Sequence, residues 1–214
     1  MSDQAPLEKE LKYYLSKEDY DTLIKATRKR VVKTVKQSNV YFDDPSLRLR
    51  KKKIGLRVRL EDGGLATLTL KEPAKVSSKK LPKLKIRHEW ESRLTLDLAK
   101  DLIKGKTAIS SLHHKPILIL RSHFNSRTLE GILPLGTVKT IRTLVRADKR
   151  VLLEIDKFKM FNKKFYELEV ETHQPVLADQ VVRSLLKKHG IAYLPITKSK
   201  LGRFLEFWKK ENQR

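Results

Sequence analysis

Apolar and polar residues alternate one by one in many short segments of this chain. A period of two predicts strands, because successive side chains of a strand point to opposite faces of its sheet. We expect strands at 6–15, 31–42, 47–50, 55–60, 65–71, 137–146, 150–157 and 164–171, with another beginning at 117–120. The turn signal Glu61-Asp62-Gly63-Gly64 joins the strands before and after it into a hairpin.

Apolar residues recur at helical spacing in other segments. Helices are expected after Ser16, at 95–104, at 176–189 and at 199–211. Ser16 and Asp19 provide a capping-box-like start for the first helix. The segment 72–85 contains two prolines and five lysines, so it is too polar and too interrupted to pack. We expect it to be a mobile basic loop.

The predicted strands dominate, the helices lie at the margins, and strands and helices do not alternate. This order predicts an α+β fold that is mainly β, with an antiparallel sheet curled into a closed barrel. No internal repeat or second domain is evident, so a single domain is expected over residues 1–214. Closure of the sheet would bring its first and last strands together.

The composition limits the chemistry that the protein can perform. The 214 residues include no cysteine, which excludes disulfides and thiolate metal sites. A formal net charge of +23 predicts polyanionic partners, but aromatic residues are only 7% and no nucleic-acid-binding motif is present, so nucleic acid is not expected. There is no signal peptide and no apolar run of the ~18 residues that a membrane span needs, so we expect a cytoplasmic protein.

Two predicted strands, far apart in the sequence, carry carboxylates at every second residue. One contains Glu8 and Glu10, and the other contains Glu167, Glu169 and Glu171. If both faces point into one interior, five glutamates converge there, and a fold tolerates this only when cations neutralise them. The pattern therefore predicts a divalent metal site and phosphate chemistry.

A basic strand face complements the acidic ones. Arg57 and Arg59 alternate with apolar residues. Arginine donates paired hydrogen bonds to phosphate oxygens, while carboxylates on a facing wall hold Mg²⁺ or Mn²⁺. A polar cavity with two such walls suits a chain of phosphates.

At these residues the sequence resembles the CYTH, or triphosphate tunnel metalloenzyme, superfamily. Its hallmark Glu-x-Glu-x-Lys appears as Glu8-Lys9-Glu10-Leu11-Lys12. Further matches follow in order at 39–43, 56–59, 69–71, 89–91, 136–142, 154–156, 166–169 and 199–200. The resemblance spans about residues 7–205 and implies an eight-stranded antiparallel tunnel that binds a triphosphate with one or two divalent cations.

The resemblance also implies roles for individual residues. The phosphate ligands would be Lys12, Arg57, Arg59, Lys71, Arg142 and Lys200. The metal ligands would be Glu8, Glu10, Glu167, Glu169 and Asp156, with Glu89, Glu91 and Glu171 as weaker candidates. Glu8, Glu10, Glu169 and Lys200 would take part in catalysis, and the cofactor would be Mg²⁺ or Mn²⁺.

The expected function is metal-dependent hydrolysis of inorganic triphosphate to pyrophosphate and phosphate. Activity like that of class IV adenylate cyclases or thiamine triphosphatases is the alternative within the superfamily, because these enzymes share the tunnel. A non-enzymatic polyphosphate or RNA binder is the alternative of another class. The lysine clusters at 51–53 and 79–85 are either solvated surface or a device that steers long polyphosphate to the tunnel. A monomer or a dimer is expected.

Overall fold

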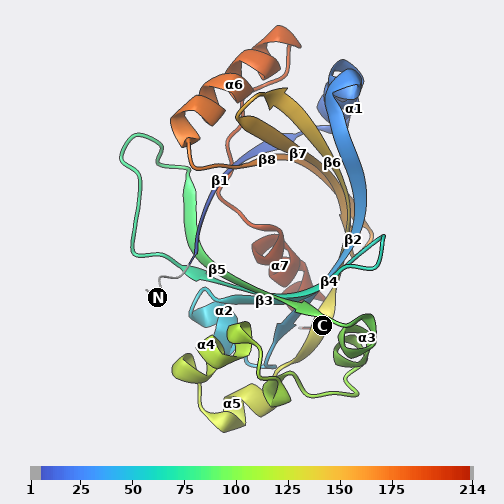
Figure 1. Cartoon of the computed structure of the whole chain (residues 1–214), viewed down its shortest axis with the longest axis vertical. Coiled ribbons are helices and arrows are strands. Elements are labelled where there is room, and N and C mark those ends of the chain that lie inside the picture. Colours follow the sequence, from blue (N-terminus) through green and yellow to red (C-terminus); the bar gives the residue numbers. More distant parts are fainter. Residues whose placement is uncertain (1–5, 213–214) are drawn as a thin grey trace.

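The computed structural model describes residues 6–212, in which eight antiparallel strands form a closed barrel (Figure 1). The strands are β1 (Leu7–Leu15), β2 (Val31–Asp43), β3 (Gly55–Glu61), β4 (Ala66–Pro73), β5 (Lys85–Leu94), β6 (Leu133–Asp148), β7 (Val151–Met160) and β8 (Lys163–Glu171). Their order around the barrel is β1-β5-β4-β3-β2-β6-β7-β8. The predicted fold is confirmed, including the pairing of the first and last strands, in which Lys12 lies opposite Glu169.

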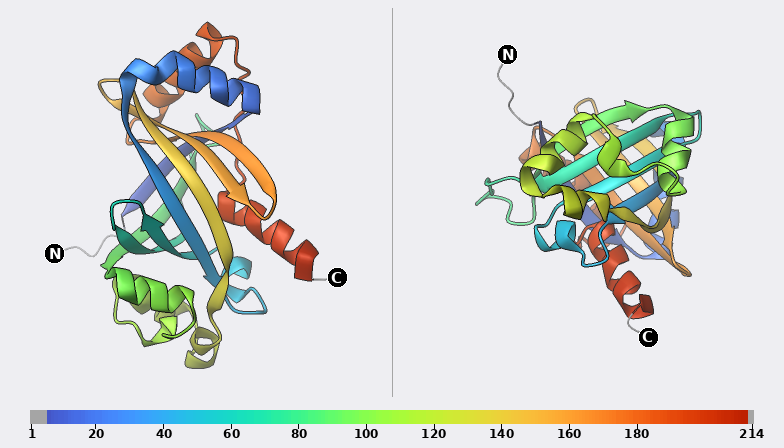
Figure 2. Two further views of the ribbon diagram at one scale, coloured as in Figure 1. Left: turned by 90° about the vertical axis from the view of Figure 1, so that its right-hand side faces the viewer. Right: turned by 90° about the horizontal axis from the view of Figure 1, so that it is seen from below.

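Helices cover the barrel on two sides (Figures 1 and 2). They are α1 (Lys17–Thr27), α2 (Arg48–Lys51), α3 (Leu96–Ile103), α4 (Lys115–His123), α5 (Ser126–Glu130), α6 (Pro175–Lys188) and α7 (Lys200–Asn212), with 3₁₀ turns at Arg28–Arg30 and Ile109–Ser111. The capping box predicted at the first helix is present, since the Ser16 hydroxyl accepts a hydrogen bond from the Asp19 backbone.

The apolar core lies mainly outside the barrel, between its outer face and the helices. One cluster packs β3 and β4 against α3 and α4 through residues such as Leu56, Leu68 and Leu120. A second packs β1, β7 and β8 against α1 and α6. A third joins α7 to β2, β6 and β7, with Phe204 as its central helical residue. These clusters leave the barrel interior free for polar residues.

Two predicted strands are helices in the structure. At 47–50 the chain forms α2, because Leu47 adopts a left-handed conformation (φ +54°) and the Asp43 and Asp44 carboxylates accept hydrogen bonds from the first backbone N–H groups of the helix. At 117–120 the chain forms α4, whose Ile117 and Leu120 are buried. A short continuous apolar run fits a buried helix as well as a buried strand.

The segment between Pro73 and Lys85 contains no helix or strand, in keeping with its assignment as a loop (Figure 1). Its mobility stays a prediction. Between residues 6 and 212, no helix is both long and apolar enough to cross a bilayer.

Gly136 of β6 provides a test of how α7 is held. Its φ is +155°, and a methyl group on its Cα would lie 2.9 Å from Cζ of Phe204. We expect Gly136→Ala to lower the free energy of unfolding by about 1–3 kcal/mol through this overlap. The test combines Gly136→Ala with Phe204→Leu. Urea unfolding of the wild type, the two single variants and the double variant measures the interaction energy between the two positions. The cost of Gly136→Ala should shrink in the Phe204→Leu background, and an equal cost in both backgrounds would contradict the explanation.

Candidate active site

The barrel encloses a cavity of about 390 Å³, which we call the central cavity. Inward-facing residues of all eight strands line it, together with Ser199, Lys200 and Leu201 at the start of α7. The charged lining consists of eight basic side chains (Lys12, Arg57, Arg59, Lys71, Lys85, Arg87, Arg142 and Lys200) and seven acidic ones (Glu8, Glu10, Glu89, Glu91, Glu154, Glu169 and Glu171). The wall is therefore close to neutral, although the protein is strongly basic.

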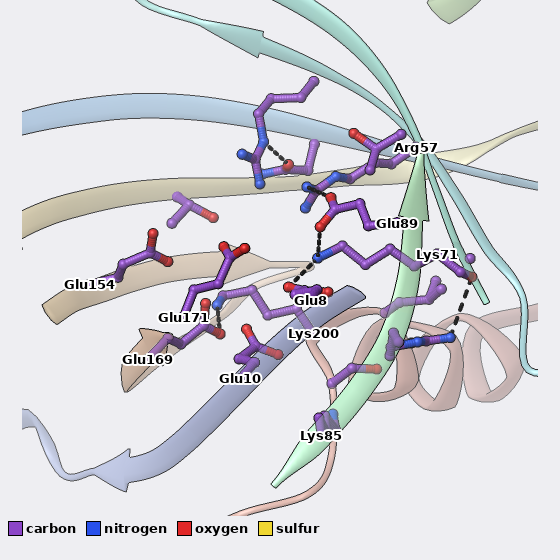
Figure 3. A pocket seen from close by; sticks show the side chains of 18 of the residues that line it. Glu8, Glu10, Arg57, Lys71, Lys85, Glu89, Glu154, Glu169, Glu171 and Lys200 are labelled. Atoms are coloured by element: carbon purple, nitrogen blue, oxygen red, sulfur yellow. Dashed lines mark hydrogen bonds and ion pairs between the residues drawn. The ribbon is translucent and has the colours of Figure 1, made fainter. Parts of the chain in front are cut away.

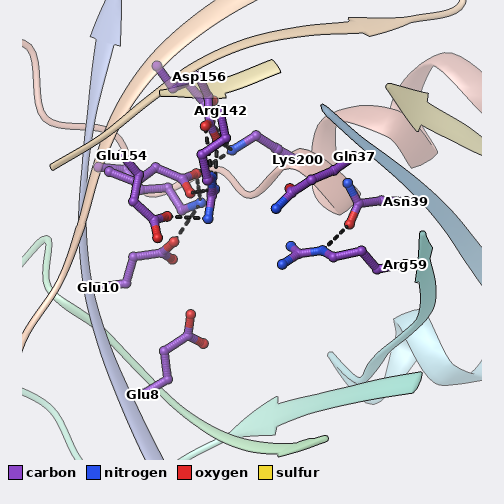
Figure 4. A network of polar contacts seen from close by, with 12 residues as sticks. Glu8, Glu10, Gln37, Asn39, Arg59, Arg142, Glu154, Asp156 and Lys200 are labelled. Carbon is purple, nitrogen blue, oxygen red and sulfur yellow. Dashed lines mark hydrogen bonds and ion pairs between the residues drawn. The ribbon is translucent and has the colours of Figure 1, made fainter. Parts of the chain in front are cut away.

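Arg142 of β6 is the centre of the first polar group (Figure 4). Its guanidinium donates to both oxygens of Asp156 at 2.9 and 2.7 Å and to Glu169 at 2.7 Å, and it also forms an ion pair with Glu154. Burial alone lowers the pKa of Arg142, but the attraction of Asp156 and Glu154 outweighs burial and holds the pKa well above its usual value. Arg142 is therefore charged and fixed.

Lys12 and Lys200 complete the neutralisation of this group. Lys200 lies 2.5 Å from Glu169 and 2.8 Å from Asp156, and Lys12 forms ion pairs with Glu169 and Glu10. Burial raises the pKa of Glu169, but Lys12 and Lys200 outweigh it, so the pKa lies well below the usual value. The protein's own cations thus satisfy the Glu169 carboxylate.

Glu167 and Asp156 lie on the same strand faces as Glu169 and Glu154, but further along the barrel. Both side chains are fully buried, and neither lines the central cavity. Glu167 contacts Arg203 at 2.7 Å and Lys200 at 3.2 Å. From these positions the two carboxylates can orient the side chains of Lys200 and Arg142.

A second acidic group lies on another part of the wall (Figure 3). Glu8 of β1, Glu89 of β5 and Glu171 of β8 each place a carboxylate oxygen within 4.8 Å of the other two. Lys71 contacts Glu8 at 2.6 Å and Glu89 at 3.1 Å, and Arg57 lies 3.6 Å from Glu89, whereas Glu171 has no ion pair within residues 6–212. Burial and the charge of Glu8 raise the pKa of Glu171. Three converging oxygen donors with too little positive charge fit a hard divalent cation.

Arg57 and Arg59 of β3 lie on the wall beside this group. Arg59 donates to the Asn39 side chain at 2.8 Å, while burial and the nearby Arg57 and Arg142 lower its pKa to about 10. Nε of Arg57 is buried, and in the described part of the chain it has no hydrogen-bond partner. Clustered, partly unsatisfied guanidinium groups favour a phosphate ligand.

Most of the residues predicted from the sequence meet in the central cavity. All six predicted phosphate ligands line it, and so do Glu8, Glu10, Glu89, Glu91, Glu169 and Glu171. Their roles remain predictions. Glu154, Lys85 and Arg87 are lining residues that the prediction omitted. Alternation could have found them, because Glu154 shares a strand face with Asp156, and Lys85 and Arg87 share one with Glu89.

The family model of the CYTH domain matches residues 6–205. The chain belongs to the CYTH domain family. In sequence, this CYTH protein is 28% identical over 204 residues to "Putative triphosphatase YjbK" of Bacillus subtilis (strain 168), and the match covers 95% of this chain and 97% of the Bacillus protein.

Solved structures share the fold of this CYTH protein. A structure described as "Putative adenylyl cyclase HpAC1 from Hippeastrum reveals a dominant triphophatase activity" has a TM-score of 0.82 at 23% identity, covering 94% of this chain and 96% of the other. A putative adenylate cyclase from Bacillus halodurans has a TM-score of 0.73 at 23% identity, covering 91% and 95%. At these identities the comparison establishes the fold alone.

Glu154 makes the stability of this CYTH protein depend on pH. Burial, together with the nearby Glu169 and Asp156, raises its pKa to about 7 despite the opposing effect of Arg142. Between the ordinary carboxyl pKa of about 4.3 and pH 7, the native state therefore holds a proton that the unfolded chain has lost, so stability falls as the pH rises. Glu154→Gln should remove the part of this decline that Glu154 causes and be more stable than the wild type by about 3 kcal/mol at pH 8, with little difference at pH 4.

Urea unfolding at several pH values in metal-free buffer measures this effect. Glu18→Gln on the surface of α1 is the control and should keep the wild-type pH dependence. A wild-type slope in Glu154→Gln would show that another group causes the decline.

Proposed function

We propose that this protein hydrolyses inorganic triphosphate to pyrophosphate and phosphate with the help of a divalent cation. The proposal rests mainly on one observation: basic side chains and a group of carboxylates occupy neighbouring parts of the cavity wall. Arg57, Arg59 and Lys71 face the interior close to the under-neutralised carboxylates Glu8, Glu89 and Glu171. A compact, highly charged anion bound together with a cation complements both parts of this wall.

Glu8, Glu89 and Glu171 would hold Mg²⁺ or Mn²⁺, and Glu10 lies on the same strand face as Glu8. Bound there, the cation would neutralise phosphate oxygens and acidify a water molecule. Glu169, Glu167 and Asp156 are matched by protein cations, so we assign them to the positioning of Lys12, Lys200 and Arg142. This differs from the roles that the sequence motif alone implies.

The basic residues would bind and orient the phosphate chain. Arg57 and Arg59 present guanidinium groups that can donate paired hydrogen bonds to phosphate oxygens. Arg142 and Lys200 are held in place by their carboxylates, so they are organised before the substrate binds. Donors fixed in advance stabilise the charge that develops on the transferred and leaving phosphates.

The lining favours the bare triphosphate over a nucleotide or thiamine ester. Tyr41 is the one aromatic residue that the described part of the chain contributes to the central cavity, so a platform for stacking a base is poorly developed. Cyclase and thiamine triphosphatase activities remain the alternatives, because the superfamily that the sequence resembles includes both. Phosphate release from tripolyphosphate, thiamine triphosphate and ATP, measured beside cyclic AMP formation, separates these activities. Dominant cyclic AMP formation would reject the proposal.

Glu8→Gln tests the metal-binding carboxylates. Removing one negative charge from the Glu8, Glu89 and Glu171 group should lower kcat for tripolyphosphate on the order of 100-fold and weaken the response to added Mg²⁺ or Mn²⁺. Glu18→Gln on α1 is the matched control and should retain wild-type activity. Tight polyphosphate binding without turnover in the wild type, unaffected by Glu8→Gln, would instead favour a non-enzymatic binder.

Ligand binding should also stabilise the fold. Tripolyphosphate at about 100 times its dissociation constant should add about 2.7 kcal/mol to the free energy of unfolding when a divalent cation is present. Thermal unfolding with and without EDTA measures the effect. A melting temperature that no triphosphate changes would contradict a binding site in the central cavity.

A further inference from the structure

A second cavity of about 320 Å³, which we call the side pocket, adjoins the central cavity. The two share Lys85, Arg87, Ser199 and Leu201 as lining residues, so they lie side by side. Lys85 lies well apart from Arg57 among the residues drawn in Figure 3. The side pocket therefore adjoins the central cavity on the side of Lys85 and Arg87.

The side pocket differs sharply from the central cavity in charge. Five basic side chains line it, namely Arg50, Lys53, Lys85, Arg87 and Lys198, and its lining in the described part of the chain includes no carboxylate. In the central cavity, by contrast, acidic residues nearly balance the basic ones. A cavity lined by cations and by no carboxylate attracts an anion.

Several of these cations lack a partner in the protein. Within residues 6–212, the side chains of Arg50 and Lys53 form no hydrogen bond or ion pair. Lys198 is paired with Glu206, and the Arg87 guanidinium donates to the backbone carbonyl of Lys53 at 2.5 Å. Arg87 is thus fixed at the junction of the two cavities, while Arg50 and Lys53 keep their donors available.

The backbone around the side pocket also favours an anion. Thr197, Lys198, Ser199 and Gly202 line it at the N-terminal end of α7, where helix dipoles favour negative charge. In addition, Pro73 and Lys85 line the pocket at the two ends of the basic segment 74–84. The two lysine clusters evident in the sequence, 51–53 and 79–85, therefore both reach this one cavity.

We propose that the side pocket binds the additional phosphate groups of a linear polyphosphate longer than triphosphate. The proposal rests on the proposed function, because the central cavity would hold the first three phosphates. A phosphate chain carries charge on every unit and has no organic part. This matches a lining that is rich in cations and, among the described residues, contains no aromatic side chain on which a base could stack. Longer chains should therefore bind more tightly than tripolyphosphate.

The double variant Arg50→Gln/Lys53→Gln tests this site, because neither residue lines the central cavity. Calorimetric titration at one fixed Mg²⁺ concentration, with phosphate release followed in parallel so that any heat of hydrolysis is subtracted, gives the dissociation constants of tripolyphosphate, tetrapolyphosphate and a long-chain polyphosphate. The wild type should bind the longer chains more tightly than tripolyphosphate. The double variant should weaken long-chain binding about tenfold, which is about 1.4 kcal/mol, and change tripolyphosphate binding less than twofold.

Lys139→Gln/Lys159→Gln is the matched control. It removes the same charge from neighbouring exposed positions on the outside of β6 and β7, so it reports on general electrostatic attraction. Equal losses in the two double variants would overturn the proposal, as would equal affinity of the wild type for short and long chains. Phosphate release from tripolyphosphate is measured separately. Its absence, with chain-length-dependent binding intact, would reject the proposed hydrolysis but keep the side pocket as a polyphosphate site.

Discussion

Neutralisation of a charged interior is the constraint on which the rest of this structure depends. Fifteen charged side chains line the central cavity, and burying charges is unfavourable unless opposite charges meet. The barrel interior therefore cannot provide most of the apolar core. Leu56 and Leu68 instead point outward onto α3 and α4, and Leu168 packs beneath α6. The helices are needed to bury the apolar outer face of the barrel. This packing stabilises the barrel and leaves its interior available for charged residues.

The carboxylates of the cavity are not all neutralised to the same extent. This difference distinguishes carboxylates that position other side chains from carboxylates that can bind a metal ion. Glu169 and Glu171 lie two residues apart on β8, yet their pKa values move in opposite directions. Three cations surround Glu169, and their attraction exceeds the cost of burial. Glu171 meets Glu8 and Glu89 instead, so burial and repulsion dominate. The fold neutralises its other carboxylates but leaves this group short of positive charge. A divalent cation can supply that missing charge.

The sequence predicted seven of the eight barrel strands, because alternation is a local property of each strand, but it assigned no strand to β5. It failed where tertiary contacts decide the local structure. The Asp43 and Asp44 caps turn 48–51 into a helix, and burial against the barrel fixes α4. In the site, alternation identifies which face a residue lies on but not how deep it lies or which cations surround it. Asp156 therefore appeared equivalent to Glu154, although Asp156 is fully buried against Arg142 and Lys200 and does not line the cavity, whereas Glu154 does.

The same reasoning locates the excess positive charge of the protein. Since the cavity lining is almost neutral, binding of a triphosphate does not by itself explain a net charge of +23. Exposed charges separated by more than about 8 Å are largely screened at physiological ionic strength, so distant lysines add little to contact energy. Lysines and arginines that line a cavity act at short range. The side pocket gathers such residues without carboxylates and adjoins the central cavity. These cations are therefore placed to bind a phosphate ligand, whereas dispersed surface lysines are not.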